Sequence, residues 1–412
     1  MSQTCVIVGA GHAAAQLAPS LRQEGWSGRI VVVGAEDVIP YHRPPLSKTL
    51  LAGEKTLEEI TIRPERVYAK DGIEFLLQTR VDSIDRDNRR LLLANGQTLN
   101  YDKLALTTGS RPRRLDLPGA DLPGIHYLRN YPDVLGIKAG IQAGRRVVII
   151  GAGYIGLEVA AVLCKLGLQV TVLELLERVL MRVATPVIAE FITRVHTAEG
   201  VRIICNAAIG GFAGHGRVEQ VLVRNGAAYD ADLVIVGAGI LPNMELAAAA
   251  GLKVDNGIVV DEYCRASDPD IVAAGDCTMH YNRSYGRWLR LESVQNAADQ
   301  ARIAAATLCG KQVAYDALPW FWSDQYDVKL QMAGLPPGHD AVSIRGDPGK
   351  GRSFAVFYFR EGRVIAVDAI NRPSEFMLGK KLIMDKMIID RTRLADEKIT
   401  VKELLTVNRQ RP

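Results

Sequence analysis

Two glycine-rich runs in the chain have the spacing that a diphosphate-binding turn requires. Each fits the pattern G-x-G-x-x-G/A directly after an apolar stretch; the runs consist of Gly9, Gly11 and Ala14, and of Gly151, Gly153 and Gly156. In such a run the first glycine permits a tight turn, the second lets the backbone approach a pyrophosphate, and a small third residue packs a helix on a strand. Free N–H groups at the start of the helix attract the phosphates.

An acidic residue follows each run at the end of the next apolar stretch. These residues are Glu36 and Glu174. A carboxylate there can accept hydrogen bonds from ribose hydroxyls, and it repels a 2′-phosphate. Glu174 therefore predicts a preference for NADH over NADPH, although Arg178 is a nearby cation that could accommodate a phosphate. Gly239, in a later glycine turn, is a further candidate contact for NAD.

Either glycine run alone could serve only to turn the chain, but two copies favour two bound dinucleotides, naturally a flavin and a nicotinamide. Asp276 follows Gly275 after an apolar strand, where its carboxylate can hold a polyol such as the flavin ribityl chain, or can simply cap the next turn. A helix beginning near Val294 could direct its positive N-terminus at the flavin pyrimidine edge.

The elements that must position these residues follow from apolar periodicity. Residues 4–36 and 146–174 each read as strand, glycine turn, helix and strand, which is the pattern of a buried parallel βαβ unit. Later segments predict strands at 232–243 and 271–276 and a helix at 294–309. From Pro319, alternating segments such as FAVFYF indicate an antiparallel sheet. The predicted fold class is α/β, with two Rossmann-like dinucleotide-binding domains and a C-terminal α+β domain.

Composition excludes several classes of protein. The 412 residues are enough for two or three domains, and no run approaches the roughly 18 apolar residues of a membrane-spanning helix. The net charge of +4 is too small to favour a nucleic-acid partner. The six cysteines and seven histidines are dispersed, so neither a disulfide framework nor a metal site is expected. Because the N-terminus shows no signal-peptide pattern, a cytoplasmic location is expected.

The motifs resemble those of the FAD-dependent NADH:ferredoxin reductases, within the glutathione reductase superfamily. Besides the two glycine runs, the resemblance is carried by YHRPPLSK (41–48), ALTTG (105–109), GYIGLEVAA (153–161), AAGDC (273–277) and PWFWSDQYD (319–327). It covers nearly the whole chain. It implies an FAD-binding domain at 1–110 and 241–318, an inserted NAD-binding domain at 111–240, and an interface domain at 319–412.

The resemblance also implies individual contacts. For FAD they are Gly9, Gly11, Ala13, Ala14, Glu36, Lys48, Val81, Arg129, Asp276 and Val294. For NAD they are Gly151, Gly153, Gly156, Glu158, Glu174 and Gly239. The chain departs from the family pattern at Ala14, where a third glycine is usual, and at Ala35, where relatives can carry an acid. The second departure leaves Glu36 as the candidate partner of the FAD ribose.

A sulfur-free segment separates this chain from the disulfide reductases of the superfamily. Those enzymes place redox cysteines after the first βαβ unit, where this chain has RPPLSK. Electrons must then leave the flavin directly, and a flavin can release them singly to an iron–sulfur partner. By resemblance, Lys48 and Glu158 form an ion pair near flavin N5 as the catalytic residues. The alternative is that they are two unrelated solvated charges.

A partner protein requires an accessible docking surface. The candidates are Arg287, Arg290, Trp322, Lys380 and Lys381. Clustered cations raise the encounter rate with an acidic ferredoxin. The alternatives are a solvated charged face for the cations and core packing for the tryptophan.

These observations together predict an NADH-dependent flavoprotein reductase. It would pass single electrons to a 2Fe-2S ferredoxin that supplies a cytochrome P450 or a Rieske-type oxygenase, as a monomer or weak homodimer. A rubredoxin or monodehydroascorbate reductase on the same fold is the rival enzyme. A flavoprotein like apoptosis-inducing factor, in which the redox state governs association, is the rival from another class. That role calls for a strongly basic surface, which the net charge of +4 does not favour.

Overall fold

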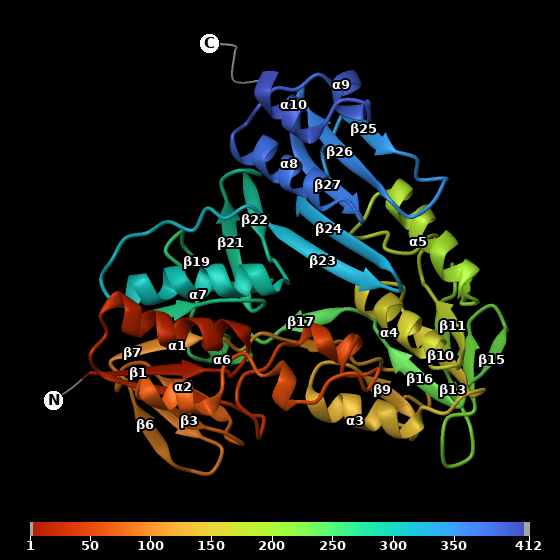
Figure 1. The fold of residues 1–412 in the computed structure, drawn as a ribbon. Helices are drawn as coiled ribbons and strands as arrows, with labels where there is room; N and C mark the ends of the chain where they lie inside the picture. Colours follow the sequence, from red (N-terminus) through yellow and green to blue (C-terminus); the bar gives the residue numbers. More distant parts are fainter. Residues whose placement is uncertain (1–2, 408–412) are drawn as a thin grey trace. The chain divides into compact units, whose positions relative to one another are not determined.

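The computed structural model describes residues 3–407 (Figure 1). The chain divides into two compact units. Unit 1 consists of the described residues up to His42, Thr56–Arg111 and Ile240–Ala317. Unit 2 consists of Arg43–Lys55, Pro112–Gly239 and the described residues from Leu318 onward. Each unit is therefore assembled from segments that are distant in the sequence.

A five-stranded parallel sheet forms the centre of unit 1. Its order is β20-β7-β1-β2-β3, with β1 (Thr4–Val8), β2 (Arg29–Val33), β3 (Ile73–Leu76), β7 (Lys103–Leu106) and β20 (Ile271–Ala273). Strand β20 pairs in parallel with β7, so segments before and after the second glycine run share one sheet. The valines and isoleucines of β1 and β2 are buried, as the sequence predicts for central parallel strands.

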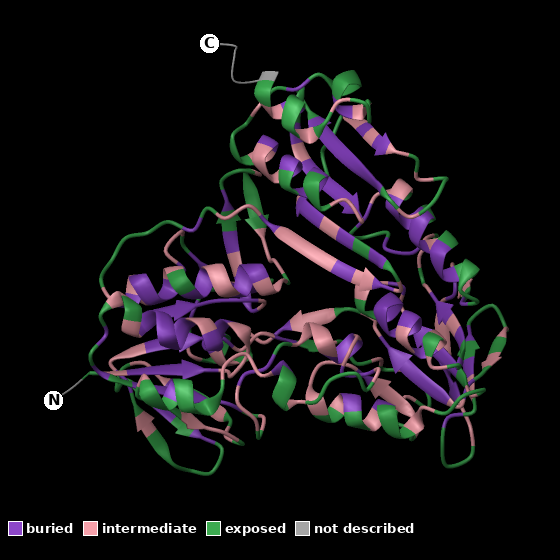
Figure 2. Ribbon diagram, in the orientation of Figure 1, coloured by how far each residue is buried: buried purple, intermediate pink, exposed green. Residues whose placement is uncertain are grey.

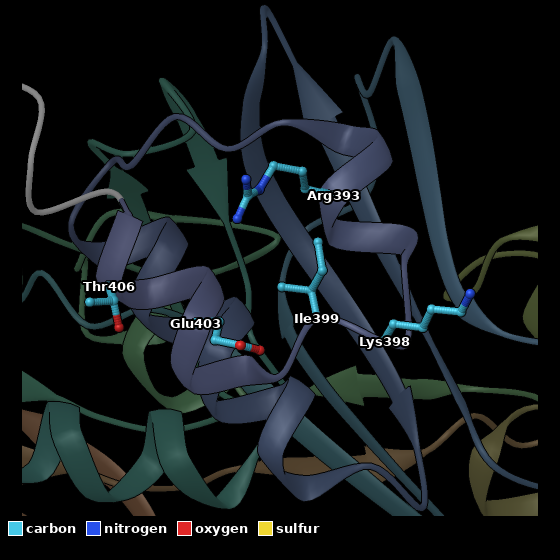
Figure 3. A pocket seen from close by; sticks show the side chains of 5 residues that line it. All are labelled: Arg393, Lys398, Ile399, Glu403 and Thr406. Carbon is cyan, nitrogen blue, oxygen red and sulfur yellow. The ribbon is translucent and has the colours of Figure 1, made fainter.

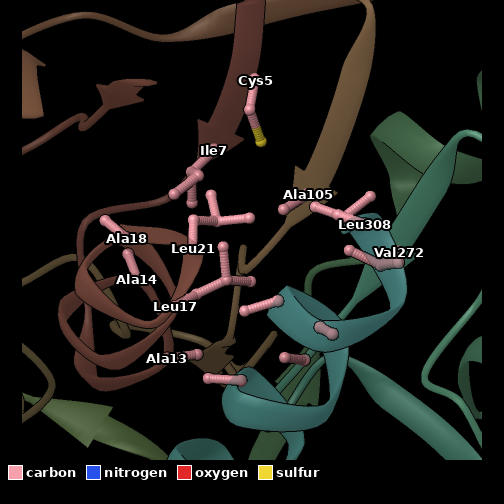
Figure 4. Close-up of a cluster of buried hydrophobic side chains, with 14 of the residues drawn as sticks. Cys5, Ile7, Ala13, Ala14, Leu17, Ala18, Leu21, Ala105, Val272 and Leu308 are labelled. Carbon is pink, nitrogen blue, oxygen red and sulfur yellow. The ribbon is translucent and has the colours of Figure 1, made fainter. Parts of the chain in front are cut away.

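Two helices cover one face of this sheet and pack against each other. They are α1 (His12–Glu24) and α7 (Val294–Leu308). Figure 4 shows Ala13, Leu17 and Leu21 of α1 pointing into a buried cluster shared with α7, and alanines on both helices allow the close approach. Gly25 follows the last residue of α1, and its φ of 102° is the left-handed conformation that favours glycine.

Helix α1 contains Pro19, which has no N–H to bond the carbonyl of Ala15. The guanidinium of Arg63, from the segment before α2 (Glu65–Lys70), donates to that carbonyl instead. A side chain therefore supplies the donor that the helix lacks.

The remaining elements of unit 1 are short. An antiparallel ribbon consists of β4 (Val81–Asp85), β5 (Arg90–Leu93) and β6 (Thr98–Asn100). A second sheet consists of β18 (Val254–Asp255), β19 (Gly257–Val260), β21 (Thr278–Asn282) and β22 (Arg287–Leu289). The short 3₁₀ helix η2 (Glu58–Ile60), the helix α6 (Glu245–Ala249) and the strand β17 (Ile240–Pro242) complete the unit. Strand β8 (Ser110–Pro112) spans the point where the chain passes into unit 2.

Unit 2 repeats the parallel arrangement around the second glycine run. The sheet order is β12-β11-β10-β16-β9, with β9 (Ile125–Tyr127), β10 (Arg146–Ile150), β11 (Gln169–Leu173), β12 (Arg202–Ile204) and β16 (Leu233–Val236). Its helices are α3 (Tyr131–Gly140), α4 (Tyr154–Lys165) and α5 (Pro186–Ala198). An antiparallel ribbon consists of β13 (Ile209–Ala213), β14 (Gln220–Val223) and β15 (Ala228–Asp230). The short 3₁₀ helix η1 (Pro44–Ser47) carries the RPPLSK segment.

The C-terminal part of unit 2 is an antiparallel sheet, as the alternating pattern predicts. Its order is β23-β24-β27-β26-β25, with β23 (Trp320–Gln325), β24 (Val328–Gly334), β25 (Ala341–Gly346), β26 (Phe354–Arg360) and β27 (Arg363–Ile370). Strands β26 and β27 are buried along most of their length (Figure 2). The helices are α8 (Pro373–Met384), which packs on β27, α9 (Arg391–Ala395) and α10 (Val401–Val407).

The predicted α/β class with two dinucleotide-binding folds and a C-terminal α+β part is confirmed. The division of the chain into three domains stays a prediction. Within residues 3–407, no helix has both the length and the apolar character needed to cross a membrane.

Candidate functional site

In the first glycine turn, one glycine is needed for packing and another leaves room for a ligand. Gly9 has a φ of 107°, and a Cβ there would lie 2.3 Å from the carbonyl oxygen of Thr107. The fold therefore requires glycine at position 9 whether or not a ligand is bound. A Cβ at Gly11 would meet no atom within 4 Å, so this glycine leaves open space beside the start of α1. That space is where a phosphate must approach the free N–H groups of the helix.

The second turn has the same geometry. A Cβ at Gly151, where φ is 100°, would lie 2.4 Å from the carbonyl oxygen of Gly237, whereas one at Gly153 would meet nothing within 4 Å. A Cβ at Gly156 would lie 2.2 Å from the carbonyl oxygen of Gly151, so the helix α4 approaches its turn closely. Ala14 occupies the corresponding place in the first unit, where its methyl group is buried. On this criterion both turns fit a dinucleotide.

The two strand-end acids lie where their motifs predict. Glu174 follows β11, and its carboxylate accepts hydrogen bonds from the backbone N–H of Ala152, at 2.7 Å, and of Leu176, at 2.9 Å. These bonds hold Glu174 against the glycine turn. Glu36 follows β2 and accepts a 2.5 Å hydrogen bond from the hydroxyl of the buried Tyr41. Sequence reasoning missed Tyr41 as the residue that orients Glu36.

Asp276 follows β20 in a turn built by Gly275, whose φ is 91°. Its carboxylate accepts a 2.8 Å hydrogen bond from the hydroxyl of Ser110. Val294 is the first residue of α7, as predicted, and Ser293 caps the helix by accepting from the backbone N–H of Asn296. Asp276 and the start of α7 thus both belong to unit 1.

A buried polar network fixes this turn to α7, and no motif indicated it. Gln300 accepts from the backbone N–H of Gly275, at 2.9 Å, and from the hydroxyl of Thr278, at 2.8 Å. Its amide nitrogen lies 3.4 Å from Nδ1 of His280. Burial lowers the pKa of His280 from its ordinary value of 6.5 to about 4, so this ring is neutral at pH 7. The only available signal was the polar residues on the inner face of an alanine-rich helix.

Lys48 and Glu158 form an ion pair, as the resemblance implies. The ammonium nitrogen of Lys48 lies 2.7 Å from Oε2 of Glu158. The Glu158 side chain is 1% exposed and that of Lys48 is 17% exposed, so the pair is not two solvated charges. Lys48 follows the 3₁₀ helix η1, and Glu158 lies one turn into α4.

Two serines that the motifs did not single out also bind the Glu158 carboxylate. Ser47 donates to Oε2 at 2.6 Å and Ser323 donates to Oε1 at 2.7 Å. Both serines are buried. A buried carboxylate with three donors is compensated for the loss of water, which is the condition for keeping a charge inside a protein.

The other predicted contacts are distributed over both units. In unit 1, Ala13 is buried on α1 and Val81 is the first residue of β4. In unit 2, the backbone of Arg129 is held by Asp133, and Gly239 has a φ of 91° with open space at its missing Cβ. Their roles in cofactor binding stay predictions.

The candidate docking residues differ in their exposure and in their contacts within the chain. Arg287 is exposed on β22, but the guanidinium of Arg290 is 14% exposed and pairs with Glu292. Lys381 pairs with Asp385. The ammonium of Lys380 lies 5.4 Å from the ring centre of Trp320, and the Trp322 ring lies 5.5 Å from that of Trp320. Trp322 is therefore partly packed and partly accessible within unit 2.

A pocket among the C-terminal helices contains none of these residues. It is lined by Arg393, Lys398, Ile399, Glu403 and Thr406 (Figure 3). The Glu403 carboxylate accepts from the backbone N–H and the hydroxyl of Thr400, so it serves to cap α10.

Two glycine turns of this geometry in one chain define an oxidoreductase of the class that binds two dinucleotides. The chain matches the model of the pyridine nucleotide-disulphide oxidoreductases over residues 3–301, and that of the reductase C-terminal domain over residues 320–405. It belongs to the pyridine nucleotide-disulphide oxidoreductase family.

Within this family, the chain is similar to reductases named for ferredoxin-type partners. It is 44% identical to putidaredoxin reductase CamA of Pseudomonas putida, over 97% of this chain and 96% of that protein. It is also 44% identical to the ferredoxin reductase subunit of the 5,5′-dehydrodivanillate O-demethylase of Sphingobium sp., over 97% and 98%. The structure of the covalent putidaredoxin reductase–putidaredoxin complex matches with a TM-score of 0.96 at 43% identity, covering 99% of each chain. The resemblance inferred from the motifs is confirmed.

Proposed function

We propose that this protein is an NADH-dependent flavoprotein reductase that passes electrons from NADH through FAD, one at a time, to a 2Fe-2S ferredoxin. The ferredoxin supplies a cytochrome P450 or a Rieske-type oxygenase. The observation that carries the proposal is the ion pair between the buried Glu158 and Lys48, which lies at the end of a segment without cysteine. At this position the chain has a charge pair and no thiol.

Each part of the chain has a definite task in this reaction. The turns at Gly11 and Gly153 bind the two pyrophosphates, and Glu174 selects a nucleotide without a 2′-phosphate. FAD, when bound, accepts a hydride as an electron pair and releases electrons singly. Glu158 anchors Lys48, whose ammonium group is the more exposed member of the pair and is held ready to orient the nicotinamide.

The partner is inferred from the relatives. One match is a covalent complex of a reductase with putidaredoxin, and another relative is named as the ferredoxin reductase subunit of an oxygenase system. A ferredoxin partner for this chain agrees with its sulfur-free segment, because an iron–sulfur carrier takes up one electron at a time.

The experiment compares electron acceptors with the purified, FAD-loaded protein and NADH. We expect 2Fe-2S ferredoxin to be reduced at least about tenfold more efficiently than rubredoxin or monodehydroascorbate, a difference of about 1.4 kcal/mol in transition-state free energy. Faster reduction of rubredoxin or monodehydroascorbate, or a protein that takes up no flavin, would contradict the proposal.

A variant pair tests the role of Lys48. Lys48→Met should slow the anaerobic reduction of bound FAD by NADH by about tenfold or more, because a charged hydrogen-bond donor is lost from a buried carboxylate. Lys55→Met is the matched control, since Lys55 lies exposed on the same segment. Equal rates for both variants would remove Lys48 from the mechanism.

We also propose a cytoplasmic location and a monomeric or weakly dimeric state. The location is supported by the six cysteines, all of which are free thiols in the structure. Fractionation of the producing cell and sedimentation of the purified protein test these two points.

A further inference from the structure

A row of buried polar side chains continues from Glu158 into the interior of unit 2. Ser323 Oγ lies 2.7 Å from Oε1 of Glu158, and the amide nitrogen of Gln325 lies 3.0 Å from Ser323 Oγ. Nε2 of His196 lies 2.8 Å from the amide oxygen of Gln325. All four side chains are buried, so water does not compete for these hydrogen bonds.

The secondary structure explains why these side chains meet. Ser323 and Gln325 are two positions apart on β23 and therefore lie on the same face of the strand. Phe321 shares that face, and its ring lies 5.1 Å from the ring of Tyr154, one turn before Glu158 on α4. His196 comes from the last turn of α5.

The hydrogen bonds of this row can point, from donor to acceptor, in only two directions. Each group in the row has few protons to donate. In the first, His196 Nε2–H donates to Gln325, Gln325 donates to Ser323, and Ser323 donates to an ionised Glu158. In the second, the Gln325 amide is turned over, every bond is reversed, and a protonated Glu158 must donate to Ser323. The direction of the row and the charge of Glu158 are therefore linked.

Both ends of the row select the first direction. At one end, Lys48 and Ser47 donate to Oε2 of Glu158, and the positive charge of Lys48 beside this oxygen favours a carboxylate. At the other end, Nδ1 of His196 is buried and has no hydrogen-bond partner among residues 3–407. In the first direction this atom carries only a lone pair, whereas in the second it would be an unpaired N–H donor. Burial also lowers the pKa of His196, which keeps the ring neutral.

We propose that Ser323, Gln325 and His196 are positioning residues that hold Glu158 ionised and fix its carboxylate so that Oε2 faces Lys48. The inference deepens the proposed function, because it concerns how the Lys48–Glu158 pair is kept ready for the nicotinamide. It does not depend on the identity of the electron acceptor.

The first test observes the row itself in the native, FAD-loaded protein. NMR with isotope-labelled histidine nitrogens, with the His196 signal assigned by its loss in His196→Gln, reports which ring nitrogen carries the proton. We expect a neutral ring protonated at Nε2 at pH 7. A ring protonated at Nδ1, or at both nitrogens, would overturn the proposal, because a neutral Nε2–H donor would then not set the direction of the row.

The second test breaks the row at constant shape. Gln325→Glu removes the N–H that donates to Ser323, and Ser323→Ala removes the bond to Glu158. Each should slow the reduction of bound FAD by NADH, and for Ser323→Ala the expected factor is about tenfold, the size of one hydrogen bond to a charged group. Ser323→Thr, which keeps the hydroxyl, should retain most of the native rate.

The matched control is Ser343→Ala, which removes a buried serine of the same sheet that donates to the backbone carbonyl of Arg391. It should leave flavin reduction by NADH unchanged. Equal rates for Ser323→Ala, Gln325→Glu and Ser343→Ala would overturn the proposal. Because flavin reduction is measured without ferredoxin, loss of ferredoxin reduction alone would contradict the proposed function and not this inference.

Discussion

Two buried carboxylates of unit 2 have different surroundings. Glu158 accepts from Lys48 and two serine hydroxyls, whereas Asp368 on β27 accepts a 2.7 Å hydrogen bond from the hydroxyl of Tyr358. No cation pairs with Asp368 in the described residues, and burial raises its pKa from 3.8 to about 7. The two carboxyl groups therefore differ in the number and charge of their donors, and the one with a single neutral donor, Asp368, is the one whose pKa is raised.

Asp368 should make the protein less stable as the pH rises. Between pH 4 and pH 7 the folded state keeps the proton that the unfolded state releases, so the free energy of unfolding falls through this range. Asp368→Asn should abolish this dependence and raise the urea midpoint at pH 8 more than at pH 5. Asp121→Asn, at an exposed position of the same unit, is the control. Parallel pH profiles for native protein and Asp368→Asn would contradict the assignment.

Glu174 should determine the choice between NADH and NADPH. Glu174→Ala removes the carboxylate that is held against the second glycine turn, so the ratio of kcat/KM for NADH to that for NADPH should fall about tenfold or more. The control is Glu177→Ala, at an exposed position three residues after Glu174, which should leave the ratio unchanged. A ratio unaltered in Glu174→Ala would argue against the ribose contact.

At the scale of an element, helix α1 depends on a residue outside the helix. Pro19 leaves the Ala15 carbonyl without its helical donor, and Arg63 supplies one. The helix carries the first glycine turn at its start and packs on α7 along its length. A defect in the middle of α1 is therefore expected to affect the stability of unit 1.

Arg63→Met should destabilise the protein by about 1–3 kcal/mol, because it leaves a buried carbonyl unpaired. The second substitution Pro19→Ala should recover much of this loss, since an alanine at this position would again offer a backbone N–H to the Ala15 carbonyl. The measurement is the urea midpoint of the single and double variants, with Arg66→Met as an exposed control. A double variant no more stable than Arg63→Met would show that the carbonyl is not the cause.

At the scale of the whole molecule, the net charge of +4 is small, so electrostatic attraction of a partner protein must come from local clusters of charged residues. Part of the predicted docking set is engaged within the chain, since Lys381 pairs with Asp385 and Arg290 pairs with Glu292. Lys380 lies over the rings of Trp320 and Phe376 and forms no ion pair with another residue in the range 3–407, so its charge is available to a partner.

The double variant Lys380→Glu, Lys381→Glu should slow the reduction of 2Fe-2S ferredoxin and leave the reduction of ferricyanide intact, because only the protein acceptor needs a docking surface. The effect should decrease at high salt. Lys350→Glu, at a highly exposed lysine of unit 2, is the control. Equal slowing with both acceptors would exclude docking at this surface.

The sequence predicted the two glycine turns, the strand-end acids and the start of α7 because these features depend on local chain geometry. Gly9 and Gly151 need a conformation with positive φ, and Val294 follows a capping serine. The repeated βαβ pattern also predicted the parallel sheets, and alternation predicted the C-terminal antiparallel sheet. Lys48 and Glu158 were paired only by resemblance, since they lie far apart in the sequence.

Only the tertiary structure decided how the charges are compensated. Ser47 lies on η1, Ser323 and Gln325 lie on β23, and His196 lies on α5, and nothing in their local sequence indicates that they converge on Glu158. The same is true of Arg63 and the Ala15 carbonyl. Local periodicity determines which residues face inward. Which inward-facing polar groups become partners depends on contacts between segments far apart in the chain, and these form only when the elements pack.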